Sequence, residues 1–400
     1  MTFDQPTTFG LLFVVATAVA IIARRVHLPY TVGLVVAGLL IGSLHVVQAP
    51  RLTEQFLFVL VLPGLVFEAA FNLRAADLWQ NRITLVLLTV PGIGLAIAVT
   101  TALLPPLAGA LTASAAFVFA ALISATDPIA VLALFRRLGI PHRLAVLIES
   151  ESLLNDATAI GFFVAAVAGA GVLDSARHFV ISLAGGACIG VAIGGLVALV
   201  IARIDDPMVE VTLTIIAAYG SFGVAQQTGF SGVLATVAAG LLTGHQAVRR
   251  GMAPSTRVAV DVFWEYLAFA LNSIVFLLIG FEVQLGRLIE VWRPIVAAFV
   301  VVLLARAATV GLATLAVSRS RERIPWRWAP VMTWGGLRGA LSMVLALSLP
   351  DTIPDRPLII AMTFGVVTLS ILGQGLSMPL LLRRLGLGGE TTSATGSAIS

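Results

Sequence analysis

Long apolar runs, separated by short polar stretches that contain arginine, occupy almost the whole chain. They lack the alternation of polar and apolar residues that marks the strands of a membrane β-barrel. A helix of about 20 apolar residues spans the hydrocarbon core of a bilayer. The pattern therefore predicts an all-α polytopic membrane protein with about thirteen transmembrane helices. The expected spans are residues 7–23, 28–46, 55–72, 83–104, 114–134, 144–170, 179–201, 210–225, 231–242, 258–281, 295–317, 328–349 and 358–382.

Composition supports this interpretation, since 59% of the residues are hydrophobic and only 11% are charged. A soluble domain carries about 25% charged residues. All 24 basic residues are arginines, and they lie mainly in loops rather than in a patch that would suggest nucleic acid. The single cysteine, Cys188, excludes a disulfide framework within the chain and a cysteine metal site. No cofactor-binding motif is found, and none is expected.

Arginines follow the first, third, fifth, seventh, ninth, eleventh and last expected spans, whereas the opposite loops have almost no basic excess. Because cytoplasmic loops collect basic residues, the N-terminus is expected outside and the C-terminus in the cytoplasm of a cell (inner) membrane. The first apolar run is expected to be a retained span rather than a cleaved signal peptide. Residues 1–387 are interpreted as one transmembrane domain, and residues 388–400 as a short polar tail without a regulatory domain.

Four charged residues fall near the middle of expected spans: Asp127, Glu151, Asp156 and Arg338. Ionisable groups at this depth cost several kcal/mol and are candidates for function. A structural salt bridge would neutralise one acid with the arginine, but the remaining negative charge needs a proton or a bound cation. Arg306 also lies in mid-span and must face protein, although the sequence does not identify its partner.

The fifth and twelfth spans are predicted to be discontinuous. Pro128 cannot donate a helical hydrogen bond and frees the carbonyl near Ser124. The stretch 335–339, Gly-Gly-Leu-Arg-Gly, weakens the twelfth span beside Arg338. Broken helices are tolerated in mid-membrane where the freed carbonyls line a polar cavity. The positions of the two spans suggest two inverted six-helix repeats that flank a seventh helix.

In the sixth span, helical spacing places Ser152 and Asp156 on one face and Glu151 and Asn155 on a neighbouring face. The first face offers a hydroxyl and a carboxylate to an ion, and the second is predicted to hold Arg338. Three further acids have two interpretations. Glu149 is either interfacial or at the mouth of an ion pathway, and Glu68 and Glu265 serve either structural pairing or gating.

Several short stretches resemble the electroneutral sodium/proton exchanger branch of the monovalent cation:proton antiporter superfamily. The matching stretches are Thr126-Asp127-Pro128, then Glu151-Ser-Leu-Leu-Asn155-Asp156, Ser231-Gly-Val-Leu-Ala235, Asn272-Ser273 with Val275-Phe-Leu-Leu-Ile-Gly280, and Gly335-Gly-Leu-Arg338-Gly-Ala. They occur in order along nearly the whole chain. The lysine used by the electrogenic branch is absent, because the chain contains no lysine.

The resemblance implies a homodimer with a dimerisation domain and a six-helix core that works by elevator-like alternating access. It implies that Asp156 binds both the ion and the proton, and that Asp127, Ser152 and the Thr126 main chain complete a Na⁺ site. Glu151, Asn155 and Arg338 would form the supporting network. Burial disfavours a charged carboxylate, so Asp156 is expected to take up a proton near neutral pH and to exchange it for one cation.

The leading hypothesis is therefore Na⁺/H⁺ exchange, possible also with Li⁺, for pH and sodium homeostasis. A K⁺/H⁺ antiporter with the same core is the close alternative, and a cation channel is a more distant one. The stretch Gly229-Phe230-Ser231-Gly232 matches the motif of intramembrane serine proteases, but no histidine is expected within reach of Ser231 to act as its base. The glycine pairs 185–186 and 194–195 are expected to permit close helix packing.

Overall fold

The computed structural model describes residues 5–26, 29–43, 55–109, 111–168, 172–249, 252–283 and 285–387. This part of the chain is helical and contains no β-strand, in agreement with the predicted fold class. By length and composition, seven helical segments are sufficient to cross a membrane. They are Arg82–Ala108, His142–Ala168, Arg177–Ile201, Pro207–Gln227, Pro254–Glu282, Trp292–Ala316 and Arg356–Arg384. Shorter apolar helices overlap the first, second, third, fifth and ninth expected spans: Leu12–Ala23, Tyr30–Ser43, Phe56–Asn72, Ala113–Ile123 and Gly232–His245.

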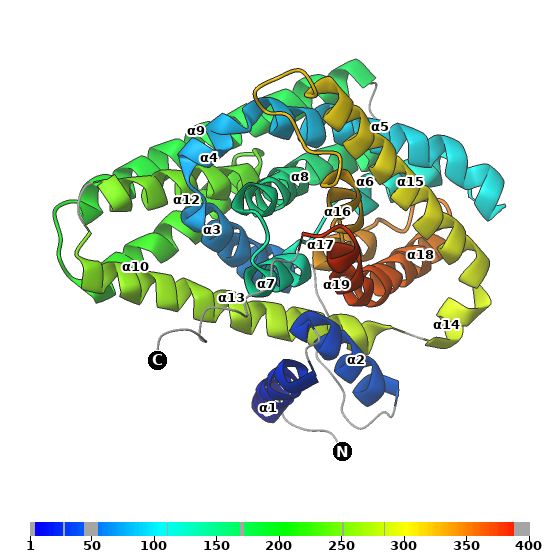
Figure 1. Ribbon diagram of the computed structural model, residues 1–400, viewed down its shortest axis with the longest axis horizontal. Helices are drawn as coiled ribbons and strands as arrows, with labels where there is room; N and C mark the ends of the chain where they lie inside the picture. The colour runs from blue at the N-terminus through cyan, green and yellow to red at the C-terminus, as the bar shows by residue number, and fades with distance from the viewer. Residues whose placement is uncertain are drawn as a thin grey trace, which may run out of the picture.

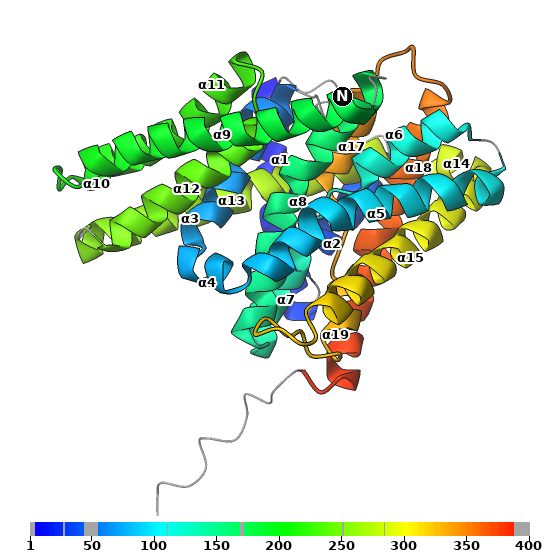
Figure 2. The same ribbon diagram turned by 90° about the horizontal axis from the view of Figure 1, so that it is seen from above.

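The helices form two bundles (Figures 1 and 2). The first bundle contains α1 (Gln5–Val26), α2 (Tyr30–Ser43), the π-helical turn η1 (Phe56–Val61), α3 (Leu62–Asn72), α9 (Val172–Ile201), α10 (Pro207–Ile215), η2 (Ile216–Gly220), α11 (Ser221–Gln227), α12 (Gly232–Arg249) and α13 (Pro254–Glu282). The second bundle contains α5 (Arg82–Ala108), α6 (Ala113–Ile123), α7 (Ile129–Leu138), α8 (His142–Ala168), α15 (Trp292–Ala316), α16 (Ala329–Trp334), α17 (Ala340–Leu347), α18 (Arg356–Leu369), η3 (Ser370–Gln374) and α19 (Gly375–Arg384). The short helices α4 (Ala75–Gln80) and α14 (Leu285–Glu290) connect the bundles.

Small residues bring the helices of the first bundle close together. A Cβ atom added at Gly186 would meet the backbone of Ser231 in the segment that leads into α12, and one at Gly194 would meet Ala239 on α12 itself. The prediction of close packing at these glycines is therefore confirmed. The hydroxyl of Ser231 accepts a hydrogen bond from the Leu234 amide and so caps the start of α12. This contact accounts for the serine of the protease-like motif without a catalytic role.

A polar cluster fastens the second bundle at one end. The guanidinium of Arg143, at the start of α8, donates to Asn81 Oδ1 (2.8 Å) and to the carbonyls of Glu322 (2.7 Å) and Arg323 (2.9 Å). The buried Glu322 carboxylate accepts hydrogen bonds from two backbone amides in the first turn of α5, at 2.8 and 3.2 Å. A carboxylate satisfies the unpaired amides of a helix N-terminus and the positive end of its dipole. The loop between α15 and α16 thus joins α5 to α8.

Candidate ion-binding site

The first unwound segment of the second bundle separates α6 from α7. Helix α6 ends at Ile123, and α7 begins at Ile129, directly after Pro128. The freed Ser124 carbonyl accepts hydrogen bonds from the Asn155 side chain (3.2 Å) and from Arg338 (2.8 Å). The predicted break of the fifth span is therefore confirmed, and side chains replace the missing helical donors.

The second unwound segment separates α16, which ends at Trp334, from α17, which begins at Ala340. The two unwound segments contact each other directly. The amide of Asp127 donates to the Leu337 carbonyl (2.8 Å), and the Arg338 guanidinium donates to the Ser124 and Ala125 carbonyls (2.8 and 3.2 Å). The predicted break of the twelfth span is thus also confirmed, and Arg338 connects the two breaks.

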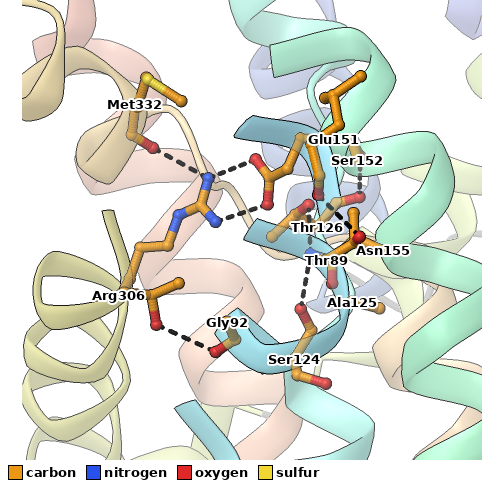
Figure 3. Close-up of polar contacts among 12 residues, drawn as sticks. Thr89, Gly92, Ser124, Ala125, Thr126, Glu151, Ser152, Asn155, Arg306 and Met332 are labelled. Carbon is orange, nitrogen blue, oxygen red and sulfur yellow. Dashed lines mark hydrogen bonds and ion pairs between the residues drawn. The ribbon is translucent and has the colours of Figure 1, made fainter. Parts of the chain in front are cut away.

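Helix α8 supplies the side chains that face the first unwound segment. The hydroxyl of Ser152 donates to the Thr126 carbonyl (2.5 Å), and the Asn155 amide donates to Thr126 Oγ1 (3.1 Å) as well as to Ser124. Ser152 and Asn155 are buried. Because both bind the same short stretch of backbone, α8 fixes the position of Thr126 and of the neighbouring Asp127 (Figure 3).

Two carboxylates, those of Asp127 and Asp156, line a cavity of about 290 Å³. Asp127 Oδ1 accepts a hydrogen bond from the Ile129 amide (3.0 Å). The Oδ1 atom of Asp156 is buried and has no hydrogen-bond partner among the described residues. Thr126 and Ser152 line the same cavity, so the four predicted ion-binding residues lie together. Carboxylate, hydroxyl and carbonyl oxygens are ligands that suit a hard cation.

The cavity continues along one face of each of two neighbouring helices. On α8 this face carries Glu149, Ser152, Leu153 and Asp156, and on α7 it carries Ile129, Leu132, Ala133 and Arg136. Residues at these spacings share one side of a helix. The cavity therefore extends from the two aspartates to the charged pair Arg136 and Glu149.

The first bundle forms the opposite wall of the cavity. Tyr30, Glu68, Glu265 and Asn272 line it from α2, α3 and α13. Glu68 accepts a hydrogen bond from the Asn72 side chain (2.9 Å). The sequence left open the role of three acids. All three, Glu68, Glu149 and Glu265, line the same cavity as Asp127 and Asp156.

The sequence suggested Arg338 as the partner of Glu151, and this prediction is wrong: the partner is Arg306. The Arg306 guanidinium forms two hydrogen bonds with the Glu151 carboxylate, both 2.6 Å long, and a third with the Met332 carbonyl (3.2 Å) (Figure 3). Both side chains are buried. The correction has a geometric reason: the side chain of Arg338 extends to the freed carbonyls of Ser124 and Ala125, whereas α15 directs Arg306 at Glu151.

Gly339 allows the second unwound segment to approach Asp127. A Cβ atom at this position would lie 2.6 Å from Asp127 Oδ2 and inside contact distance of two further atoms of that side chain. Gly339→Ala is therefore expected to displace the Asp127 carboxylate and to reduce cation-dependent transport at least about tenfold, because misplacement of a site by about 1 Å has effects of this order or larger.

Gly311→Ala is a matched control, since no atom lies within 4 Å of the added Cβ at Gly311 on the neighbouring helix α15. Transport rates of the two variants in reconstituted vesicles, normalised to folded protein, would test this prediction. Equal rates would contradict the close approach to Asp127.

Comparisons with known proteins find similarity along nearly the whole chain. The sequence model described as the transmembrane sodium/hydrogen exchanger matches residues 11–384. The Na⁺/H⁺ antiporter ApNhaP of Aphanothece halophytica is 37% identical over 377 residues, which cover 91% of this chain and 71% of the relative. The low-affinity Na⁺/H⁺ antiporter NhaS1 of Synechocystis is 35% identical over 399 residues, covering 96% and 75%.

The solved structure of the sodium proton antiporter MjNhaP1 from Methanocaldococcus jannaschii at pH 8 has the same fold, with a TM-score of 0.77 at 22% identity. The match covers 96% of this chain and 98% of that chain. Fold, site and relatives define a multi-pass membrane transporter and not an enzyme. The chain belongs to the sodium/hydrogen exchanger family, within the monovalent cation:proton antiporter superfamily.

Proposed function

We propose that this protein exchanges Na⁺ for H⁺ across the cell membrane. The observation that carries the proposal is that Asp127 and Asp156 line one cavity together with Ser152 and Thr126, whose hydroxyl and main-chain carbonyl are hydrogen-bonded to each other. Relatives that cover most of the chain are named Na⁺/H⁺ antiporters, which supports the same substrates here.

Asp156 is the group for which Na⁺ and H⁺ compete. Its buried Oδ1 atom lacks a partner among the described residues, so an ion or a proton is needed to stabilise the negative charge. Asp127, Ser152 and Thr126 supply the other oxygens. Glu151 is paired with Arg306, and Asn155 has no proton that it can release. One carboxylate per cycle gives one H⁺ per cation, an electroneutral exchange that needs no cofactor.

The two bundles support an elevator-type movement. All four proposed ligands belong to the second bundle, while α2, α3 and α13 of the first bundle form the opposite cavity wall. A displacement of the second bundle along this wall would carry the site from one side of the membrane to the other. The cavity runs towards Arg136 and Glu149, which is the cytoplasmic end in the proposed orientation with the N-terminus outside, and this supports an inward-facing state.

The membrane arrangement proposed from the sequence fits the same picture. Thirteen crossings arise when α6 with α7, α10 with α11, α16 with α17, and α18 with α19 each count as one, and the short helices α4 and α14 are not counted. The packing of α5 on α8 resembles that of α15 on α18, which supports two inverted repeats. The first bundle would form the dimer interface of a homodimer. Residues 1–387 would comprise the whole transport domain, and the tail 388–400 lies outside the described residues.

The test uses purified protein in proteoliposomes that contain a pH dye. Addition of external Na⁺ is expected to make the lumen alkaline, and Li⁺ is expected to replace Na⁺ in part. No Na⁺-driven current is expected on a solid-supported membrane, and a current would contradict the 1:1 stoichiometry. A response to K⁺ alone would replace Na⁺ as the substrate, and a lack of response to every cation across the pH range would overturn cation/proton exchange.

A further inference from the structure

The last long helical segment changes its hydrogen-bond pattern beside the second unwound segment. Between α18 and α19, residues Ser370–Gln374 form the π-helical turn η3. Such turns inside helices often mark functional positions. Ser370 and Gln374 are 0% and 4% exposed, although they are polar residues in an apolar span. Buried polar side chains require specific partners, and both find them in the segment that contains Arg338.

Three hydrogen bonds run in a single direction through these residues. The Arg338 amide donates to Ser370 Oγ (3.0 Å), the Ser370 hydroxyl donates to Gln374 Oε1 (2.5 Å), and Gln374 Nε2 donates to the Trp334 carbonyl (3.2 Å). The Trp334 carbonyl can only accept, so the Gln374 side chain turns its Nε2 atom towards Trp334 and its Oε1 atom towards Ser370. The Ser370 hydroxyl therefore donates its one proton to Gln374 and accepts from the Arg338 amide.

The chain of hydrogen bonds closes over the break in the twelfth span. Trp334 is the last residue of α16, and Arg338 precedes α17 by two residues. The guanidinium of Arg338 in turn holds the carbonyls of Ser124 and Ala125, which directly precede Thr126. Ser370 and Gln374 do not line the ion cavity. They can influence the site only through the unwound segment that contains Arg338, whose Leu337 carbonyl also accepts from the Asp127 amide.

We propose that Ser370 and Gln374 are positioning residues for ion transport, which hold the Gly335–Gly339 segment so that Arg338 orders the carbonyls next to the Na⁺ site. The inference rests on the proposed Na⁺/H⁺ exchange.

The surroundings of the two residues make the hydrogen bonds difficult to replace. Beside them lies a void of about 10 Å³, lined also by Arg306, Thr333 and Gly336 and separate from the ion cavity. This volume is sufficient for about one water molecule. If a side chain is truncated here, the Arg338 amide or the Trp334 carbonyl loses its protein partner, and one water molecule is the most that can take its place.

Ser370→Ala and Gln374→Met are expected to raise the apparent KM for Na⁺ about fivefold to tenfold, the effect of losing one buried hydrogen bond. Weaker Na⁺ binding competes less well with protons, whose site on Asp156 does not include the Thr126 carbonyl. The acid limb of the pH profile at fixed Na⁺ should therefore move to higher pH, by about one unit for a tenfold loss. Na⁺-dependent dye responses across pH and Na⁺ concentration would measure both quantities.

Thr363→Val is the matched control, because Thr363 is equally buried on α18 but its hydroxyl donates only to Ile359 of the same helix (2.7 Å). It should keep the wild-type KM. Gln374→Glu provides a rescue: a protonated glutamate can accept from Ser370 and donate to Trp334, so its KM should match wild type at the acid end of the range.

The outcomes separate the two proposals. An inactive wild type would overturn the exchange function itself. Active wild type with an unchanged KM and pH profile in Ser370→Ala and Gln374→Met would overturn the positioning role, as would a lower maximal rate alone, which indicates less folded protein. A failure of Gln374→Glu to recover the KM under acid conditions would also contradict it.

Discussion

Replacing Asp156 with asparagine is expected to abolish Na⁺-dependent proton movement while leaving the protein folded. Asparagine has nearly the same shape, but it neither carries the negative charge that attracts Na⁺ nor releases a proton. The Asp156 side chain makes no ion pair with the described residues, and its Oδ1 atom lacks a hydrogen-bond partner there. Removal of the charge therefore relieves a buried, unpaired charge, and the asparagine Oδ1 can still accept a hydrogen bond as the carboxylate does, so thermal stability should not fall.

Glu149→Gln is the matched control for Asp156→Asn. Glu149 lies two turns earlier on the same cavity-facing side of α8, and the substitution also replaces a carboxylate with an amide. It should retain exchange with at most a modest change in apparent Na⁺ affinity. Dye responses in proteoliposomes would measure the exchange activity of both variants, and thermal unfolding would measure their stability. If Asp156→Asn exchanged Na⁺ for H⁺ at the wild-type rate, Asp156 would not be the carboxylate that binds the transported proton.

The unwound segments were predictable because their causes are local. Pro128 lacks an amide proton, and the glycines around Arg338 weaken the helix whatever surrounds them. The facing pairs on α8 followed in the same way from the helical period, since Ser152 and Asp156 must lie on one side. Covalent structure and helix geometry therefore predicted the two breaks and the shared face of Ser152 and Asp156, whereas the grouping of Asp127 and Thr126 with them came from the family resemblance.

The partner of Arg306 could not be predicted, because it depends on how α15 packs against α8. Glu151 and Arg306 are separated by 155 residues, and the sequence offered Arg338 as an equally suitable cation. Ser370 and Gln374 have a related explanation. A serine and a glutamine in an apolar span indicate that their side chains need hydrogen-bond partners, but not which partners. The π-helical turn that turns both side chains towards the second unwound segment forms only in the folded bundle.

The two buried arginines, Arg306 and Arg338, have different partners, and this explains why the candidate ion site retains negative charge. Arg306 neutralises Glu151, while Arg338 uses its guanidinium on the neutral carbonyls of Ser124 and Ala125. Arg338 therefore holds the unwound backbone without forming an ion pair with Asp127 or Asp156. Asp156 remains available to a cation or a proton, and Asp127 remains available to the cation.

Replacement of Arg306 with methionine is expected to have the largest effect on stability. It would leave the Glu151 carboxylate buried and unpaired, a change that costs about 3–5 kcal/mol in the free energy of unfolding. The Met332 carbonyl would also lose its contact. We expect low yield, a markedly lower unfolding temperature in detergent and little transport. The double variant Glu151→Gln/Arg306→Met removes the charge together with its partner and should unfold at a higher temperature than Arg306→Met alone.

Arg257→Ala is the control, because Arg257 pairs with Asp261 at 3.7 Å on an exposed surface of α13, where such pairs contribute about 0–1 kcal/mol. Its unfolding temperature should match wild type. If Arg306→Met also matched wild type, the buried pair would not stabilise the second bundle. If the double variant were no more stable than Arg306→Met, the loss would arise from the contact with Met332 or from packing against Gly336, and not from the unpaired charge. If the double variant recovered the unfolding temperature but not transport, the pair would have two separable roles, in stability and in transport. The double variant would still lack the hydrogen bond from Arg306 to the Met332 carbonyl, which ties α15 to α16 next to the second unwound segment.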